Sequence, residues 1–152
     1  MRPEYDFNIR VTGILIEDGK LLIVKQKLSE SRTWSLPGGR LERGETVAQG
    51  LVRECREETG LDVQVDRLLY LCDVGSSSNT ILHITFLVSR IGGALVLPTN
   101  EFDENPILDV KFVKLEELLD YGFSDAFMQL AKQGFPMQGN YMGDKKNIGV
   151  GL

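Results

Sequence analysis

Short apolar runs separated by turn residues dominate the beginning of the chain. Residues 8–27, NIRVTGILIEDGKLLIVKQK, contain two runs rich in Ile, Leu and Val on either side of Asp18-Gly19. An Asp-Gly pair between two such runs is a strong signal for a two-residue hairpin turn, and continuous apolar runs are typical of strands covered on both faces. We therefore expect two strands joined by a tight turn, then an exposed loop at residues 28–34 and a sharp turn at residues 36–39.

A helical period follows over residues 46–59. Its apolar positions recur at i, i+3, i+4 and i+7 and form one stripe, which consists of Ala48, Leu51, Val52 and Cys55. Thr46 with Gln49 three positions later fits a capping box, and Gly60 followed by Leu61 fits a glycine cap with its hydrophobic contact. The pattern predicts one helix with a defined beginning and end.

The rest of the chain alternates strand patterns with two short helices. Strands are expected at residues 62–74, 80–90, 94–97 and 107–113, and helices at residues 114–120 and 124–133. From Gly134 onward, five glycines in nineteen residues predict a weakly specified segment. We therefore expect an α/β fold with helices packing on a mixed sheet, as one domain over residues 1–134 with a glycine-rich tail over residues 135–152. The early hairpin argues against a purely parallel, doubly wound sheet.

Composition narrows the class of protein. A chain of 152 residues with 42% hydrophobic and 26% charged positions suits one soluble globular domain. The net charge of −5 argues against extended electrostatic binding of nucleic acid. It does not exclude an anionic substrate, because a metal ion can reverse the charge of a local site. Cys55 and Cys72 are expected to be reduced core residues. Because the N-terminus has no apolar leader and no run is long enough to span a bilayer, we expect a cytoplasmic protein with no membrane partner.

Three glutamates of the predicted helix, Glu54, Glu57 and Glu58, fall within five positions. At about 100° per residue they form one cluster to the side of the apolar stripe, where Glu54 and Glu58 repel each other. A divalent cation turns that repulsion into attraction, and ligands that are all oxygen favour Mg²⁺ or Mn²⁺. The alternative interpretation is a solvated charged face that Arg53 and Arg56 neutralise.

The segment before the helix favours the metal site. Pro37-Gly38-Gly39 offers backbone with no side chain to obstruct a ligand or an ion. A carbonyl group of this segment could join the carboxylates at one metal.

This segment and the helix together resemble the Nudix box, GX5EX7REUXEEXGU, in which U is apolar. Its fixed positions are filled by Gly39, Glu45, Arg53, Glu54, Glu57, Glu58 and Gly60, with Cys55 and Leu61 at the apolar places. The flanking order of hairpin, turn, box and later strands resembles the Nudix family across about residues 8–132. The resemblance implies an α/β/α sandwich with a mixed sheet, and hydrolysis of a nucleoside diphosphate linked to some moiety X.

The resemblance also implies roles for the residues of the box. The expected catalytic and metal-binding positions are Arg53, Glu54, Glu57 and Glu58, with the carbonyl of Gly39 or Gly38 as a further ligand of Mg²⁺ or of Mn²⁺ as its substitute. Arg53 is expected to orient the glutamates. Glu54 is left open as a ligand, as the general base that takes a proton from the attacking water, or as both. Glu45 is expected to be a structural residue or an outer metal contact.

Other candidates lie outside the box. Some family members take the general base from a distant loop, and the loop candidates here are Glu101, Asp103 and Glu104, with an ordinary polar loop as the alternative. Candidates for substrate binding are Arg10, Lys25 and Lys27 of the first hairpin, and Glu101 and Glu104. Solvent-facing strand residues are the alternative for the first three. Trp34 either stacks on a base or packs in the fold.

Two further features are read in two ways. His83, the only histidine, is interpreted as a plain strand residue or as part of a pocket. Residues 141–149, YMGDKKNIG, are interpreted as an irregular end of the chain or as a tail that contacts phosphate.

The box indicates the chemistry and not the substrate. Subgroup markers for ADP-ribose, dinucleoside polyphosphates and coenzyme A are missing; for example, residues 75–80, GSSSNT, lack the proline of ADP-ribose hydrolases. We therefore expect a nucleoside triphosphate pyrophosphatase of the mutator type. ADP-ribose or another nucleotide sugar is the alternative substrate class, and a non-catalytic Nudix-fold nucleotide-binding or regulatory module is the alternative function. A homodimer is left open, and no extended nucleic-acid binding is expected.

Overall fold

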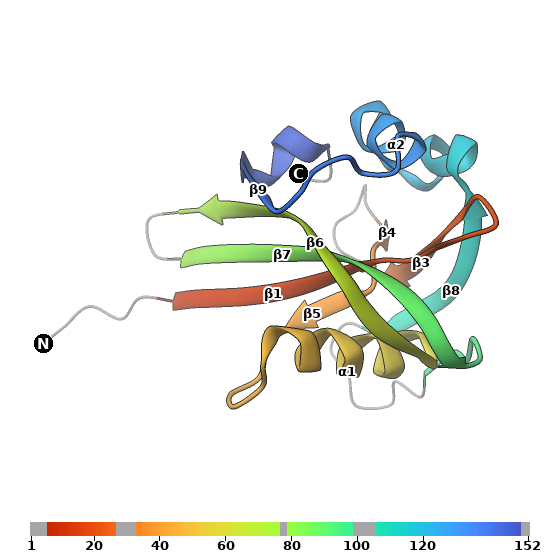
Figure 1. The fold of residues 1–152 in the computed structure, drawn as a ribbon, viewed down its shortest axis with the longest axis horizontal. Helices are drawn as coiled ribbons and strands as arrows, with labels where there is room; N and C mark the ends of the chain where they lie inside the picture. The colour runs from red at the N-terminus through yellow and green to blue at the C-terminus, as the bar shows by residue number, and fades with distance from the viewer. Residues whose placement is uncertain (1–5, 27–32, 77–78, 99–105, 150–152) are drawn as a thin grey trace, which may run out of the picture.

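Two β-sheets with helices on opposite sides make up the fold (Figure 1). The structure, a computed structural model, describes residues 6–26, 33–76, 79–98 and 106–149. The strands are β1 (Asp6–Ile14), β2 (Ile16–Glu17), β3 (Lys20–Gln26), β4 (Trp34–Ser35), β5 (Gly38–Arg40), β6 (Leu61–Gly75), β7 (Asn79–Gly93), β8 (Ile107–Lys114) and β9 (Asn140–Asp144). The helices are α1 (Val47–Thr59) and α2 (Asp125–Lys132), with 3₁₀ turns η1 (Leu115–Tyr121) and η2 (Lys145–Ile148).

The first sheet has the strand order β5-β1-β7-β6-β9, and the second has the order β2-β3-β4 with β8 paired to β3. The pairs β1–β7 and β6–β9 are parallel, and the other pairs are antiparallel. Helix α1 lies on one side of the sheets, and α2 and η1 lie on the opposite side (Figure 1). The predicted α/β sandwich is confirmed, although its strands form two sheets rather than one.

Asp18 and Gly19 form the predicted tight turn, with φ angles of 52° and 74°. These left-handed angles match a turn that follows the twist of the flanking strands. Only β2 pairs with β3 across the turn, because the strand is interrupted at Leu15 and β1 pairs with β5 and β7 in the other sheet. The single predicted strand before the turn is therefore two strands, and the chain passes from one sheet to the other between them.

Helix α1 begins and ends at the predicted residues. Thr46 and Gln49 form the reciprocal capping box, and Gly60 adopts the left-handed conformation at the C-terminal end. The predicted apolar stripe is wrong at Ala48, which is exposed, because the buried face of the helix passes through Gly50 instead. A Cβ at Gly50 would lie only 2.6 Å from the Cδ1 atom of Leu41, so this helical glycine allows close packing.

The strand predicted at residues 94–97 is absent, because the described residues there are irregular. Gly93 has a left-handed φ angle of 77°, which ends β7, and Leu95, Val96 and Leu97 are exposed by 38%, 59% and 54%. A backbone hydrogen bond, from Val96 N–H to the Thr59 carbonyl at 2.9 Å, holds this segment beside the end of α1.

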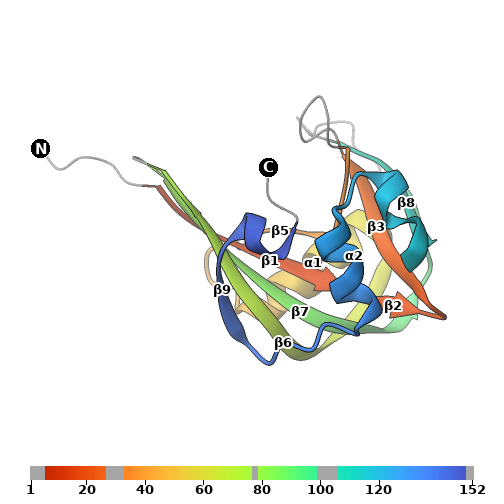
Figure 2. The same cartoon turned by 90° about the horizontal axis from the view of Figure 1, so that it is seen from above.

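The glycine-rich tail predicted after Gly134 is not weakly specified over residues 135–149. It contains β9, which pairs with β6 as the edge strand of the first sheet, and η2 (Figure 2). Phe135 and Ile148 have exposed fractions of 0% and 1% and belong to the core. Glycine content misled the prediction, because the apolar anchors between the glycines have no regular period.

Two clusters of buried side chains fill the fold. One lies between α1 and the sheets and includes Leu51 and Cys55. The other includes α2, η1 and the end of the chain, and it contains Cys72, Phe127 and Phe135. Both cysteines are buried and free, as predicted. Within the described ranges, no helix is long and apolar enough to cross a membrane.

Candidate active site

Arg53 is the centre of a charged network on α1. Its guanidinium holds Glu45 with two hydrogen bonds, from Nε at 2.6 Å and from Nη2 at 3.0 Å. Its Nη1 donates to Glu54 at 2.9 Å and to Glu57 at 3.1 Å, and its Nη2 also donates to the Arg40 carbonyl at 3.2 Å. Paired charge-assisted bonds of this kind fix geometry as well as add energy. The predicted orienting role of Arg53 therefore has a structural basis.

Glu45 is part of the frame that holds Arg53. Its carboxylate accepts a hydrogen bond from the backbone N–H of Glu42 at 2.8 Å in addition to the two from Arg53. The bonds from Arg53, followed by the backbone bond, hold the pKa of Glu45 below its usual value. Of the two predicted roles of Glu45, the structure supports the structural one.

Glu58 and Glu54 face the two glycines of the turn before the helix. The backbone N–H of Gly38 donates to Glu58 at 2.7 Å. A Cβ atom at Gly39 would lie 2.6 Å from the carboxyl carbon of Glu54, so only glycine leaves room for the carboxylate there. The Gly-Gly pair therefore allows both carboxylates to approach the backbone of β5.

Burial dominates the electrostatics of these two carboxylates. It raises the pKa of Glu58 to about 8, although the bond from Gly38 acts in the opposite direction. Burial also raises the pKa of Glu54, against the lowering influence of Arg53. Glu57 differs from both, because its side chain is 59% exposed. The helix thus carries two half-buried carboxylates and an exposed one. Because their negative charges repel, ionisation of each carboxyl group makes ionisation of the others less favourable.

The donor set fits a hard divalent cation. The Glu54 carboxylate occupies the space that a side chain at residue 39 would fill, Glu57 and Glu58 follow on the same helix, and oxygen ligands suit Mg²⁺ or Mn²⁺. Among the described residues, no three His, Cys, Asp or Glu side chains converge closely enough to hold an ion. Glu54 and Glu57 share Arg53 instead, while Glu58 turns to Gly38. The metal-binding roles of Gly39, Glu54, Glu57 and Glu58 stay predictions.

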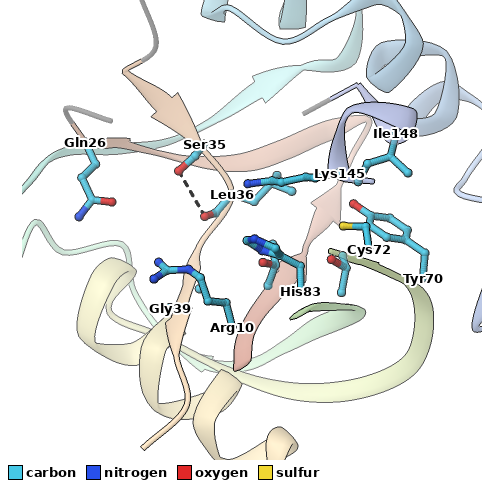
Figure 3. A pocket seen from close by; sticks show the side chains of 13 residues that line it. Arg10, Gln26, Ser35, Leu36, Gly39, Tyr70, Cys72, His83, Lys145 and Ile148 are labelled. Carbon is cyan, nitrogen blue, oxygen red and sulfur yellow. Dashed lines mark hydrogen bonds between the residues drawn. The ribbon is translucent and has the colours of Figure 1, made fainter. Parts of the chain in front are cut away.

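Neighbouring strands build the floor of a cavity of about 100 Å³ beside these glycines (Figure 3). Strand pairing places Arg10 of β1 opposite His83 of β7, and His83 opposite Cys72 of β6. Two positions further along, the same pairing forms a second row, which consists of Thr12, Thr85 and Tyr70. Side chains two positions apart share a face of a sheet, so both rows point into the cavity.

Arg10 is the predicted substrate contact that the structure places in this cavity, beside Gly38 and Gly39. His83 is 8% exposed and lines the cavity, so the pocket interpretation of this residue is confirmed. Lys145 enters from η2 at the opposite side of the cavity from β1 (Figure 3). Basic side chains therefore reach the cavity from two opposite sides, Arg10 from β1 and Lys145 from η2.

The other predicted substrate contacts lie elsewhere. Trp34 packs edge-on against Tyr121, with ring centroids 5.3 Å apart, and the Nζ atoms of Lys25 and Lys111 lie 5.8 Å and 4.9 Å from its ring centroid. Neither Lys25 nor Trp34 lines the cavity, and the contacts support the packing role of Trp34. The predicted residues Lys27, Glu101, Asp103 and Glu104 lie outside the described part of the chain.

Sequence reasoning did not identify Tyr70, Cys72 and Thr85 as residues that line the cavity. Lys145, which also lines it, belongs to residues 141–149, for which a tail that contacts phosphate was one of the two interpretations. Tyr70 and Thr85 hydrogen bond through their side chains, and burial raises the pKa of Tyr70. The available signal was a pair of polar or polarisable residues two positions apart inside an apolar strand, as in Tyr70-Leu71-Cys72. That signal shows which side chains share a face but not which strands lie together.

Comparison with known proteins identifies the family. A family model for the NUDIX domain matches residues 7–131. The chain belongs to the NUDIX domain family, and the prediction from the box is confirmed.

Curated relatives and solved structures agree with this assignment. The chain is 39% identical over 90 residues to an ADP-ribose pyrophosphatase of Methanocaldococcus jannaschii, covering 57% of this chain and 53% of the relative. It is 42% identical over 84 residues to a MutT-like protein of Streptomyces ambofaciens, covering 55% and 50%. The chain thus spans about half the length of these relatives. A solved NUDIX hydrolase from Nitrosomonas europaea superposes with a TM-score of 0.68 at 21% identity, covering 91% of this chain and 93% of that one, which shows the shared fold. The predictions of a Nudix hydrolase by family and of a Nudix fold are confirmed.

Proposed function

We propose that this protein hydrolyses the diphosphate linkage of a nucleoside diphosphate derivative, with Mg²⁺ as cofactor and Mn²⁺ as its substitute. One observation carries the proposal: Arg53 holds Glu54 and Glu57, and the backbone N–H of Gly38 holds Glu58. Gly38 and Gly39 also line a cavity with cationic side chains. The NUDIX family and the pyrophosphatase named among the relatives support the same class of reaction.

The carboxylates Glu54, Glu57 and Glu58 would hold the metal, with the Gly39 carbonyl beside them. The ion, when bound, screens the negative charge of the diphosphate and polarises its oxygens. Arg53 keeps Glu54 and Glu57 in place through Nη1, so their orientation does not depend on the substrate.

Glu54 is a further candidate for the general base. Its side chain is 15% exposed and lies against Gly39, at the border between the box and the cavity. A carboxylate at this border can accept a proton from a water that attacks the diphosphate. Arg10, on the neighbouring strand, is positioned to bind a phosphate oxygen from the cavity side.

Two substrate classes have support. A nucleoside triphosphate, cleaved by a pyrophosphatase of the mutator type, agrees with the missing subgroup markers and with the MutT-like relative. ADP-ribose or another nucleotide sugar agrees with the ADP-ribose pyrophosphatase among the relatives. We favour the nucleoside triphosphate, because cationic residues from two sides suit the more highly charged substrate.

A screen of nucleoside diphosphate derivatives with Mg²⁺ and Mn²⁺, with products identified by mass in ¹⁸O-labelled water, tests the proposal. We expect hydrolysis of nucleoside triphosphates to the monophosphate and pyrophosphate, with the label showing which phosphorus is attacked. Binding of nucleotides without turnover of any compound would instead identify a non-catalytic binding module.

A further inference from the structure

Turn η2, which directly follows strand β9, lines the cavity with residues outside the match to the family model, which ends at residue 131. Asn140 pairs with Tyr70, and Asp144 pairs with Asp73, in a parallel ladder along β6. The next residue after this ladder is Lys145, the first residue of η2, and it lines the cavity. The position of Lys145 at the cavity therefore follows from the strand pairing.

The position of η2 depends on its neighbours rather than on the charge of Lys145. Ile148 is 1% exposed and anchors the turn in the core. The Asp144 side chain caps the turn by accepting a hydrogen bond from the backbone N–H of Lys146 at 2.9 Å. The ammonium group of Lys145 can therefore be removed with little expected change in the backbone.

The side chains around the cavity include two basic residues and a histidine. Arg10 enters from β1, Lys145 from η2, and His83 lies between them on the floor (Figure 3). Of the described residues that line the cavity, none is acidic. The nearest carboxylate on β6, that of Asp73, accepts hydrogen bonds from the Tyr141 hydroxyl at 2.8 Å and 3.0 Å. A donor-rich pocket without a lining carboxylate favours a phosphate or carboxylate group over a neutral sugar.

We infer that Lys145 is a specificity-determining residue, which selects substrates whose moiety X carries an anionic group that reaches this cavity. The inference rests on the proposed function and adds a substrate class to it. The anionic group has two chemical sources, the terminal phosphate of a nucleoside triphosphate or an acidic group on a sugar. Whichever of the two groups supplies the negative charge, Lys145 contacts the substrate on the side away from the glutamates of α1.

The test uses two substrates that differ in one group, UDP-glucuronate and UDP-glucose, together with the nucleoside triphosphate UTP. The variants are Lys145→Met, which keeps the length of the side chain without its charge, and Lys146→Met as the matched control. Lys146 is exposed and does not line the cavity. Because uracil is present in all three compounds, a difference between them does not come from the base.

With Lys145→Met we expect kcat/KM for the anionic substrate to fall about tenfold, mainly through KM, while kcat/KM for UDP-glucose changes less than about twofold. A loss on UTP alone identifies the terminal phosphate, and a loss on UDP-glucuronate alone identifies the sugar acid. Lys146→Met is expected to match the wild type on all three. Equal losses on charged and neutral substrates, or no loss on any, would overturn the assignment.

A binding measurement separates this inference from the proposed function. Isothermal titration of the wild type and both variants with inorganic pyrophosphate, in the presence of EDTA, measures binding to the cationic cavity without hydrolysis. We expect Lys145→Met alone to weaken binding about tenfold. If no compound is hydrolysed but this difference is found, the proposed reaction fails and the anion site stands. If hydrolysis is found without this difference, the reaction stands and the role of Lys145 fails.

Discussion

Helix α1 carries the glutamates proposed to bind a metal, and the C-terminal segment of residues 135–149 contributes Lys145 to the cavity, but the two are specified in different ways. The bounds and caps of α1 depend on residues that are close together in the sequence, such as Thr46 with Gln49 and Gly60 with Arg56. The C-terminal segment has no such local signals, and β9 depends on pairing with β6 about seventy positions earlier. The comparison shows that the part of the site proposed to cleave the bond is locally specified, whereas the part proposed to bind moiety X depends on tertiary structure.

The largest effect is expected from Phe135→Ala in the C-terminal segment. Phe135 is fully buried and packs against Phe127, with ring centroids 5.6 Å apart. Removing a buried ring leaves a cavity, which costs about 3–5 kcal/mol of unfolding free energy. Urea denaturation measures the change. A loss below about 1 kcal/mol would mean that the segment is not an integral part of the fold.

The second largest effect is expected from Glu57→Gln on α1. The side chain is 59% exposed, so the fold should persist while Mg²⁺-dependent hydrolysis falls about 10²–10³-fold. The matched control is Glu42→Gln, since Glu42 lies 3.6 Å from the same arginine and is 66% exposed. Steady-state rates at several Mg²⁺ concentrations test the prediction. Full activity of Glu57→Gln would refute the metal-binding role of this residue.

A smaller effect is expected from Gly39→Ala, which adds a Cβ atom 2.6 Å from the carboxyl carbon of Glu54. The carboxylate must move away, and we expect kcat to fall about tenfold, because small displacements of catalytic groups are costly. The control is Gly75→Ala, where the added atom meets nothing within 4 Å. Unchanged activity of Gly39→Ala, with an unchanged melting temperature, would show that the position of Glu54 is not critical.

The smallest effect is expected from Thr46→Ala, which removes the side chain that caps α1. The hydroxyl oxygen accepts a hydrogen bond from Gln49 N–H at 3.1 Å, and losing such a cap costs about 1 kcal/mol. Thr46→Ser keeps the acceptor and should restore most of the stability. Thermal unfolding of the three proteins checks this. If the alanine and serine variants were equally stable, the cap would not contribute to the stability of α1.

The sequence was sufficient for those features that local chemistry decides. The Asp18-Gly19 turn, the caps of α1 and the glutamates of the box were all predicted, because each is defined by residues a few positions apart. The shift of the buried face to Gly50 was not, since it depends on Leu41 in another segment. Tertiary packing thus overrides a helical pattern even within the best predicted element.

The cavity shows the same limit more clearly. Arg10, His83 and Cys72 lie in one row only because β1 pairs with β7 and β7 with β6. Alternation along each strand indicates which residues share a face, but strand order and register depend on contacts between distant segments. The position of Lys145 at the cavity was not predicted for the same reason, as nothing near this residue in the sequence indicates that it follows a paired strand. A tail that contacts phosphate was only one of two interpretations of residues 141–149.

The parallel pairing of β1 with β7 has a consequence for the order in which the protein folds. The Asn8 side chain donates to the Asn79 side chain, 71 positions later, so β1 lacks this neighbour until the intervening residues have been synthesised. The chain must close a loop of this length, at a cost in conformational entropy, before the pairing of β1 with β7 stabilises the fold. Folding is therefore slower than in a protein whose contacts are mostly local. During synthesis, β1 therefore stays without this partner strand while helix α1, whose caps are local, can already form.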